Sequence, residues 1–332
     1  MSHDVLNPPV IDVTEMLHEL RGDMLREMPR PVGTMVSAGC GGKWYFDWIE
    51  RQYGRVARHI GVEYFARRPD ELPDNAVWIA GTCSDMPGIP DASADLMFSG
   101  QNIEHLWPDE VAGFLTEAAR IVRPGGWLVI DSPNSAITQR LTWSHPEHTV
   151  EMTPSEMTEL LRLAGFTVTK CAGLWLCRDA ADGRLLPFDP NDPVDDWPIA
   201  KRIEAARERP DDSFIWWIEA KRDKAAAPDA GAIRTRLNAI FADAWPMRIQ
   251  RLVAGAEMAE EQRDGDDWIV AAPGKIGIAM FGPYLPLKPG AYRVEFSLAP
   301  EPITAPAATP EPDDDLYAIL DVAHGANGTV LA

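Results

Sequence analysis

The sequence predicts an α/β protein with a doubly wound sheet, followed by a second, smaller all-β domain. Three observations predict this class. The 332 residues are enough for about two domains. Up to about residue 223, short apolar runs alternate with helix-length amphipathic segments, an order that builds a parallel sheet with helices on both faces. Beyond the following alanine-rich stretch, short strand-like segments are separated by glycine and proline turns, which is typical of a β-sandwich-like module.

The chain begins with an amphipathic helix. Asp12 and Glu15 form a capping-box pattern, and apolar residues recur at helical spacing from Val13 to Met24. Pro29 ends this pattern before the first strand. We therefore expect residues 1–30 to form an N-terminal helical arm.

Seven apolar segments have the length and composition of strands. In order they are 34–37, 60–63, 77–80, 96–99, 127–131, 166–170 and 214–220. Helices are expected between them, for example after Pro108 and after Thr153, where Pro154 and Glu156 complete an N-terminal capping pattern. Residues 31–223 should form this domain, with a long excursion over 178–212 that is rich in Asp and Pro.

The residues after 223 are expected to form a linker and then a second domain. Residues 224–232, mostly alanine with Pro228 and Gly231, are the expected linker. Residues 233–332 should form a helix over 233–253 and then five short strands of the sandwich-like domain. Five strands leave exposed sheet edges, so either a partner or self-association completes the sheet, or the domain is incomplete.

Composition argues against several classes of protein. Asp and Glu (51) outnumber Lys and Arg (31), and the net charge of −20 repels polyanions, so we expect no nucleic-acid partner. Four cysteines without a CxxC pair argue against a disulfide framework or a structural metal site. The chain shows no membrane-length apolar run and no signal-peptide pattern at its start. These features predict a cytoplasmic protein with no transmembrane segment.

A glycine-rich turn follows the first strand. Gly39, Cys40 and Gly41 would let the backbone approach a ligand near the N-terminus of the next helix. Trp44 stands where a dinucleotide fingerprint requires glycine, which disfavours a nicotinamide cofactor. Glu63 ends the second strand, where a carboxylate in a doubly wound fold can accept both hydroxyls of a ribose; a solvent-exposed acid is the alternative.

Polar loops also follow the third and fourth strands. Thr82 and Cys83 belong to the first of these loops and Asn102 to the second. Because ligands of such folds bind at the carboxyl ends of the strands, these loops should meet in one crevice.

Taken together and in this order, the motifs resemble class I S-adenosylmethionine-dependent methyltransferases of the type 11 kind. The resemblance covers about residues 31–223. Its motifs are Gly39-Cys40-Gly41, Glu63, Asp85-Met86-Pro87, Asp95-Leu96, Ile103-Glu104-His105-Leu106, Glu117 with Arg120 to Gly126, Ser132-Pro133-Asn134 and Leu163-Ala164-Gly165-Phe166.

The resemblance implies a seven-stranded, mostly parallel sheet with an antiparallel last strand, and S-adenosylmethionine as cofactor. It also implies a role for each matching residue: backbone contact with the methionine end for Gly39, Cys40 and Gly41, the ribose for Glu63, the adenine edge for Thr82 and Cys83, and the sulfonium for Asn102. The sequence departs from the family pattern at Ser37 and Lys43.

Methyl transfer to a hydroxyl requires positioned reactants and removal of a proton. His145 and His148 lie in a loop after the fifth strand with two acids, and histidine suits this task. We select His148 as the base and His145 as the second candidate; capping or backbone contacts are the alternative for both. No third histidine is near them in the sequence, and Ca²⁺ or Mg²⁺ would prefer oxygen ligands, so we expect no metal.

The segment from Met280 to Tyr292 resembles β-sandwich modules in proteins of bacterial surface-polysaccharide synthesis. That resemblance implies a saccharide acceptor, on which Trp268, Tyr284 or Tyr292 could stack; a plain hairpin is the alternative. The leading hypothesis is therefore a saccharide O-methyltransferase of polysaccharide biosynthesis. Two alternatives remain: a non-catalytic scaffold or glycan-binding protein, suggested by Ser37 and Lys43, and a small-molecule carbon or nitrogen methyltransferase.

Overall fold

The computed structural model describes residues 10–30, 33–143, 145, 147–194, 197–223 and 226–254, together with six short strands beyond residue 256. The chain divides into two units, residues 1–283 and 284–332. Among the described residues, no helix is long and apolar enough to cross a membrane.

The larger unit contains one seven-stranded sheet with the strand order β3-β2-β1-β4-β5-β7-β6. Strands β1 to β5 pair in parallel, and β7 is antiparallel to both β5 and β6. The sheet is therefore mostly parallel with seven strands, as predicted. The strands are β1 (Thr34–Ala38), β2 (Arg58–Glu63), β3 (Ala76–Ala80), β4 (Ala94–Gly100), β5 (Val122–Pro133), β6 (Phe166–Gly173) and β7 (Ile215–Arg222).

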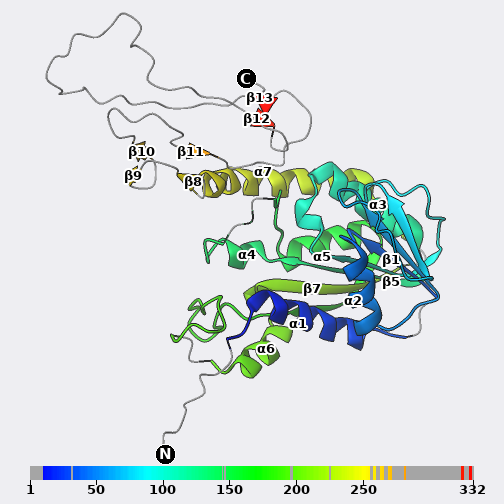
Figure 1. The fold of residues 1–332 in the computed structure, drawn as a ribbon, viewed down its shortest axis with the longest axis horizontal. Helices are drawn as coiled ribbons and strands as arrows, with labels where there is room; N and C mark the ends of the chain where they lie inside the picture. The colour runs from blue at the N-terminus through cyan, green and yellow to red at the C-terminus, as the bar shows by residue number, and fades with distance from the viewer. Residues whose placement is uncertain are drawn as a thin grey trace, which may run out of the picture. The chain divides into compact units, whose positions relative to one another are not determined.

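Helices cover both faces of this sheet, and each face has its own apolar core. One core gathers residues of α3 (Pro108–Ile121), α5 (Pro154–Leu163) and α7 (Ala230–Ala254), and these helices lie on one side of the sheet in Figure 1. The other core gathers residues of α1 (Val13–Glu27), α2 (Lys43–Gln52) and α6 (Ile199–Arg207). Two short 3₁₀ helices, η1 (Ile103–His105) and η2 (Pro210–Asp212), and the one-turn α4 (Ser135–Thr138) complete the domain.

Helix α1 begins as its sequence predicts. The Asp12 side chain accepts a hydrogen bond from the Glu15 amide, which satisfies one of the free donors at the helix start. The predicted arm, however, is part of the domain. Met24 and Leu25 are completely buried, and Arg21 forms a buried ion pair with Asp131 of β5. The amphipathic pattern of α1 is therefore explained by packing on the sheet.

The expected linker also differs from the structure. Helix α7 begins at Ala230, inside the stretch 224–232. Ile233, Leu237 and Ile240 are buried in the same core as α3 and α5. The first turns of this helix therefore pack on the α/β domain, through the apolar face that carries these three residues.

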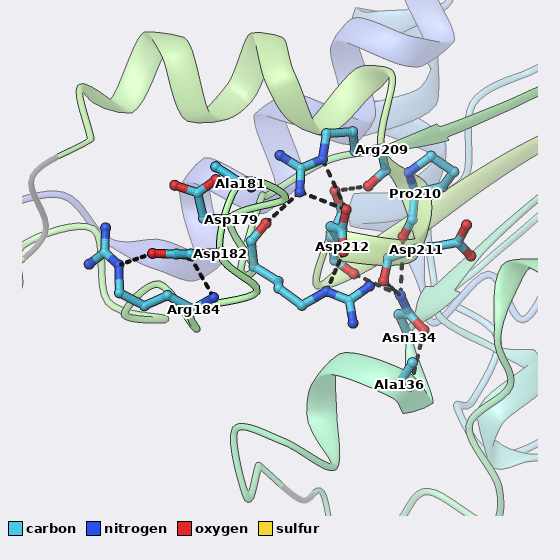
Figure 2. Close-up of polar contacts among 12 residues, drawn as sticks. Asn134, Ala136, Asp179, Ala181, Asp182, Arg184, Arg209, Pro210, Asp211 and Asp212 are labelled. Carbon is cyan, nitrogen blue, oxygen red and sulfur yellow. Dashed lines mark hydrogen bonds and ion pairs between the residues drawn. The ribbon is translucent and has the colours of Figure 1, made fainter.

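The excursion over 178–212 is anchored to the sheet by a polar network (Figure 2). The Asn134 side-chain amide donates hydrogen bonds to the carbonyls of Pro210, Asp211 and Ser213 at 3.1, 3.3 and 3.1 Å. Asn134 also caps α4 by accepting from the Ala136 amide. The same contacts thus connect the excursion to the loop after β5.

The excursion contains a helix that its Asp/Pro-rich composition did not predict. Arg202 of α6 is completely buried, with its guanidinium 3.7 Å from the centre of the Trp175 ring. It donates to the carbonyls of Leu176 and Pro187. Contacts of Arg202 with residues outside the helix thus help to hold α6 in place, together with its apolar residues Ile199 and Ile203.

A second all-β domain is not confirmed. The described C-terminal strands pair as three short antiparallel ladders, β8 (Glu257–Met258) with β11 (Met280–Phe281), β9 (Gln262–Asp264) with β10 (Trp268–Val270), and β12 (Ala323–His324) with β13 (Thr329–Val330). Most of the predicted sandwich, including Tyr284 and Tyr292, lies outside the described residues.

Strands β1 and β2 carry a buried polar pair that should make stability depend on pH. His59 Nε2 and Ser37 Oγ are 2.8 Å apart, and burial lowers the pKa of His59 from 6.5 to about 4. The unfolded chain therefore binds the proton more readily between these two pH values. The free energy of unfolding should therefore decrease as the pH falls from 6.5 towards 4. The contribution of His59 to this decrease is roughly 3 kcal/mol.

Urea unfolding at several pH values between 7.5 and 4 tests this expectation. His59→Gln keeps a polar group beside Ser37 but does not titrate, so its loss of stability over this range should be smaller than that of the wild-type protein. Equal pH dependence of the two proteins would contradict the assignment to His59.

Candidate active site

The glycine-rich turn lies at the carboxyl end of β1. Gly39 and Gly41 have φ angles of +75° and +58°, a region that glycine adopts without strain. The amides of Gly39 and Cys40 donate to the carbonyl of Val62 on β2, at 3.0 and 3.2 Å. The turn is therefore held against the second strand and is a defined part of the strand edge.

Glu63, at the end of β2, points at this turn. Its Oε2 accepts a hydrogen bond from the Gly41 amide at 2.8 Å, and its Oε1 accepts from the amides of Phe65 and Ala66 at 2.8 and 3.0 Å. The side chain is nearly buried, with 8% of the residue exposed. Three amides thus fix a carboxylate at the tip of β2.

The Cys40 side chain faces away from the strand edge. Its sulfur would lie 2.7 Å from a Cβ placed on Gly61 of β2, so the thiol packs against the sheet. Burial raises the pKa of this thiol to about 12. Only the backbone of Cys40 is therefore suited to ligand contact.

Three of the predicted residues meet at the tips of β1 and β4. The Asn102 side-chain amide donates to Ser99 Oγ at 3.0 Å and lies 3.6 Å from Cys83 Sγ. A Cβ on Gly39 would clash with the Asn102 side chain, at 2.6 Å from its Cγ. Burial raises the pKa of the Cys83 thiol to about 11, so it is uncharged at neutral pH.

The Thr82 side chain makes hydrogen bonds within its own loop. Its hydroxyl is 2.9 Å from that of Ser84 and accepts from the Ser84 amide at 3.2 Å. These bonds shape the loop after β3, next to Cys83.

A second polar group lies in the loop after β5. His148 Nδ1 and Glu151 Oε1 are 2.8 Å apart, and the two side chains are only 6% and 7% exposed. Glu151 also accepts a hydrogen bond from the Thr138 hydroxyl on α4. A carboxylate oxygen can only accept, so Nδ1 of His148 is the donor of the first bond.

The fold brings η1 against this loop. The amide of Thr149 donates to the Glu104 carbonyl at 2.7 Å, and the His105 and His148 rings are perpendicular with their centres 4.8 Å apart. The His145 ring stacks on that of His148 at 4.6 Å. The sequence did not predict this group of three histidines, because His105 is about 40 positions from His145 and His148 along the chain. In the fold, His105 nevertheless contacts both rings.

Glu104 is the functional candidate that sequence reasoning missed, although it belongs to the motif after the fourth strand. The residue is completely buried, and among the described residues neither carboxylate oxygen has a hydrogen-bond partner. The Ser132 hydroxyl lies near it without completing a bond of ordinary geometry. Burial raises the pKa of Glu104 to about 7, against the opposing effect of His148. Burial likewise lowers the pKa of His105 to about 4.

The sheet order and the strand tips together define a Rossmann-like domain with a ligand site at its carboxyl edge. The residues present fit a nucleoside cofactor, because a carboxylate ends β2 and the glycine-rich turn brings backbone to the strand edge, where a side chain on Gly39 would clash with Asn102. The comparisons with known proteins identify the class more closely.

Residues 36–130 match the methyltransferase domain family. A probable S-adenosylmethionine-dependent methyltransferase of Mycolicibacterium smegmatis is 34% identical over 151 residues, 42% of this chain and 54% of that protein. One of Mycobacterium tuberculosis is 35% identical over 153 residues, 42% of this chain and 51% of that protein. The chain thus spans about half the length of these curated relatives.

Two further similarities are weaker. A malonyl-[acyl-carrier protein] O-methyltransferase of Hahella chejuensis is 26% identical over 113 residues, 32% of this chain and 38% of that protein. The crystal structure of a methyltransferase from Archaeoglobus fulgidus has a TM-score of 0.44 at 19% identity and covers 64% of this chain and 95% of that one.

Residues 36–130 of this chain thus resemble a methyltransferase domain, and they lie within a seven-stranded, Rossmann-like sheet. The cofactor that this similarity implies is S-adenosylmethionine, on which the relatives are named as dependent.

Proposed function

We propose that this chain is an O-methyltransferase that transfers the methyl group of S-adenosylmethionine to a saccharide hydroxyl in polysaccharide biosynthesis. The observation that supports oxygen as the acceptor is the His148–Glu151 pair. A hydroxyl must lose a proton during methylation, and this pair supplies an oriented imidazole to accept it. The name of the Hahella chejuensis relative, an O-methyltransferase, agrees with this type of reaction.

When bound, S-adenosylmethionine supplies an electrophilic methyl group. In the proposal, the backbone of Gly39, Cys40 and Gly41 contacts the cofactor's methionine end and Glu63 its ribose. Thr82 and Cys83 border the adenine, and Asn102 lies at the reacting end. These roles place the cofactor along the tips of β1 to β4.

His148 would act as the base. Glu151 holds Nδ1 of the imidazole, so Nε2 receives the proton of the acceptor hydroxyl, and the buried position excludes competing water. His145, stacked on His148, is the second candidate and could position the ring.

The saccharide acceptor rests on the resemblance of the segment 280–292, most of which lies outside the described residues. The purified chain should be incubated with methyl-labelled cofactor and a panel of glycans, malonyl-acyl carrier protein and small amines. Label on a glycan that survives mild alkali is expected, because an ether resists hydrolysis. Alkali-labile label would indicate a carboxyl acceptor, and label on amines would contradict oxygen transfer.

Cofactor binding has its own test. Glu63→Gln should weaken binding of S-adenosylmethionine by about 10- to 100-fold in calorimetric titration, because charge-assisted hydrogen bonds to the ribose hydroxyls are lost. Glu71→Gln, at an exposed acid, is the matched control and should bind normally. If both variants bind as the wild-type chain does, Glu63 does not hold the ribose.

A further inference from the structure

The polar cluster beside η1 has the composition of a transition-metal site. One carboxylate oxygen of Glu104 and one ring nitrogen each of His105 and His148 lie within 4.8 Å of one another. Two imidazoles and a carboxylate form a ligand set for first-row transition metals such as zinc and iron, with positions left for water or substrate.

The surroundings of the two histidines agree with metal ligation. His105 Nδ1 is 3.2 Å from the carbonyl of Glu147, and His148 Nδ1 is 2.8 Å from Glu151 Oε1. A carbonyl and a carboxylate can only accept, so Nδ1 donates in both rings, and Nε2 is then the ring nitrogen suited to a metal ion. Metal-ligating histidines are typically oriented in this way, by a carboxylate or a backbone carbonyl on the other nitrogen.

The burial of the Glu104 carboxylate is a second, independent observation that points to a bound cation. A completely buried carboxylate whose oxygens have no hydrogen-bond partner among the described residues is costly, because charge is removed from water without compensation. A cation between Glu104 and the two imidazoles would remove that cost.

We propose that Glu104, His105 and His148 bind one divalent first-row transition-metal ion. The site shares His148 with the proposed methyl transfer, so its role in that reaction rests on the proposed function. An acceptor hydroxyl bound to the ion would lose its proton more easily, since a metal lowers the pKa of a bound hydroxyl. His148 would then be a ligand, and the proton would pass to solvent or a nearby acid.

Metal uptake by the full chain, free of any histidine tag, tests the proposal without any assay of activity. After chelator treatment, the protein should take up one equivalent of Zn²⁺ or Co²⁺ in equilibrium dialysis, and bound Co²⁺ should give a visible absorption band. Mg²⁺ should bind far more weakly, since imidazole suits zinc and cobalt better.

Glu104→Gln should weaken Co²⁺ binding by at least ~100-fold, more than loss of an outer contact does. Glu147→Gln is the matched control, since only the backbone carbonyl of this exposed residue contacts His105. If Glu104→Gln does not fold, His105→Gln serves instead. Absence of one-to-one uptake by the wild-type chain, or equal uptake by the wild-type and ligand variants, would overturn the proposal.

Measuring metal uptake and methyl transfer on the same protein distinguishes failure of the metal site from failure of the proposed function. Metal uptake with no methyl transfer would leave the site in place and contradict the proposed function. Transfer at an unchanged rate by chelated protein, with no uptake, would contradict the metal site and leave His148 as the base.

Discussion

Asp131→Ala is expected to lower the free energy of unfolding by about 3–5 kcal/mol, the usual result of removing one partner from a buried ion pair. Arg21 Nε lies 3.0 Å from both carboxylate oxygens of Asp131, and the two side chains are 4% and 0% exposed. The Gln101 amide donates to the same carboxylate at 2.7 Å. The variant would therefore leave a buried guanidinium without its counter-charge. Urea unfolding at pH 7 measures the effect.

The double variant Arg21→Met/Asp131→Leu is the informative control. It removes both charges and retains apolar volume next to Trp48 and Phe98, which the guanidinium now contacts. Because a buried pair is often replaced by apolar residues at little cost, the double variant should be more stable than Asp131→Ala. A loss below about 1 kcal/mol in the single variant would show that water or another group compensates Arg21.

His148→Gln should reduce kcat by ~10²-fold or more if His148 removes the acceptor's proton. Affinity for S-adenosylmethionine should stay unchanged, because the residues proposed to bind the cofactor lie on β1 to β4 and their loops. Glutamine preserves a polar side chain beside Glu151 but cannot accept the proton at neutral pH. Single-turnover transfer with labelled cofactor is the appropriate measurement.

His145→Gln is the comparison, because this ring stacks on His148, whereas Glu151 bonds to the His148 ring. A large loss in His145→Gln together with normal transfer by His148→Gln would move the base to His145. Repeating both measurements on chelator-treated protein distinguishes a base from a metal ligand. If chelation alone abolishes transfer and metal restores it, His148 acts through the metal.

Local signals in the sequence were sufficient for the α/β domain. The seven strands appear where apolar runs predict them, and Thr153 with Glu156 forms the predicted capping box at the start of α5. These features depend on residues only a few positions apart. Regular helices and strands impose such short periods on a chain, so a single sequence reveals them.

The candidate site was predictable in part. Glu63 and Asn102 follow their strands directly, so their positions at the sheet edge follow from the order of the strands. The contact between Glu63 and the Gly41 amide could not be predicted, because it depends on how far the side chain turns towards β1. The helix within the excursion was missed because tertiary contacts of Arg202 hold it.

By itself, the sequence determined the class of the α/β domain and most of its helix and strand positions. Only the tertiary structure decided that α1 is part of the domain, through the bond between Arg21 and Asp131, which are 110 positions apart. It also decided that Glu104 and His105 meet His148. The reason is physical: burial and charge pairing depend on which loops are neighbours in space, and no local pattern records the neighbour of a side chain across a sheet.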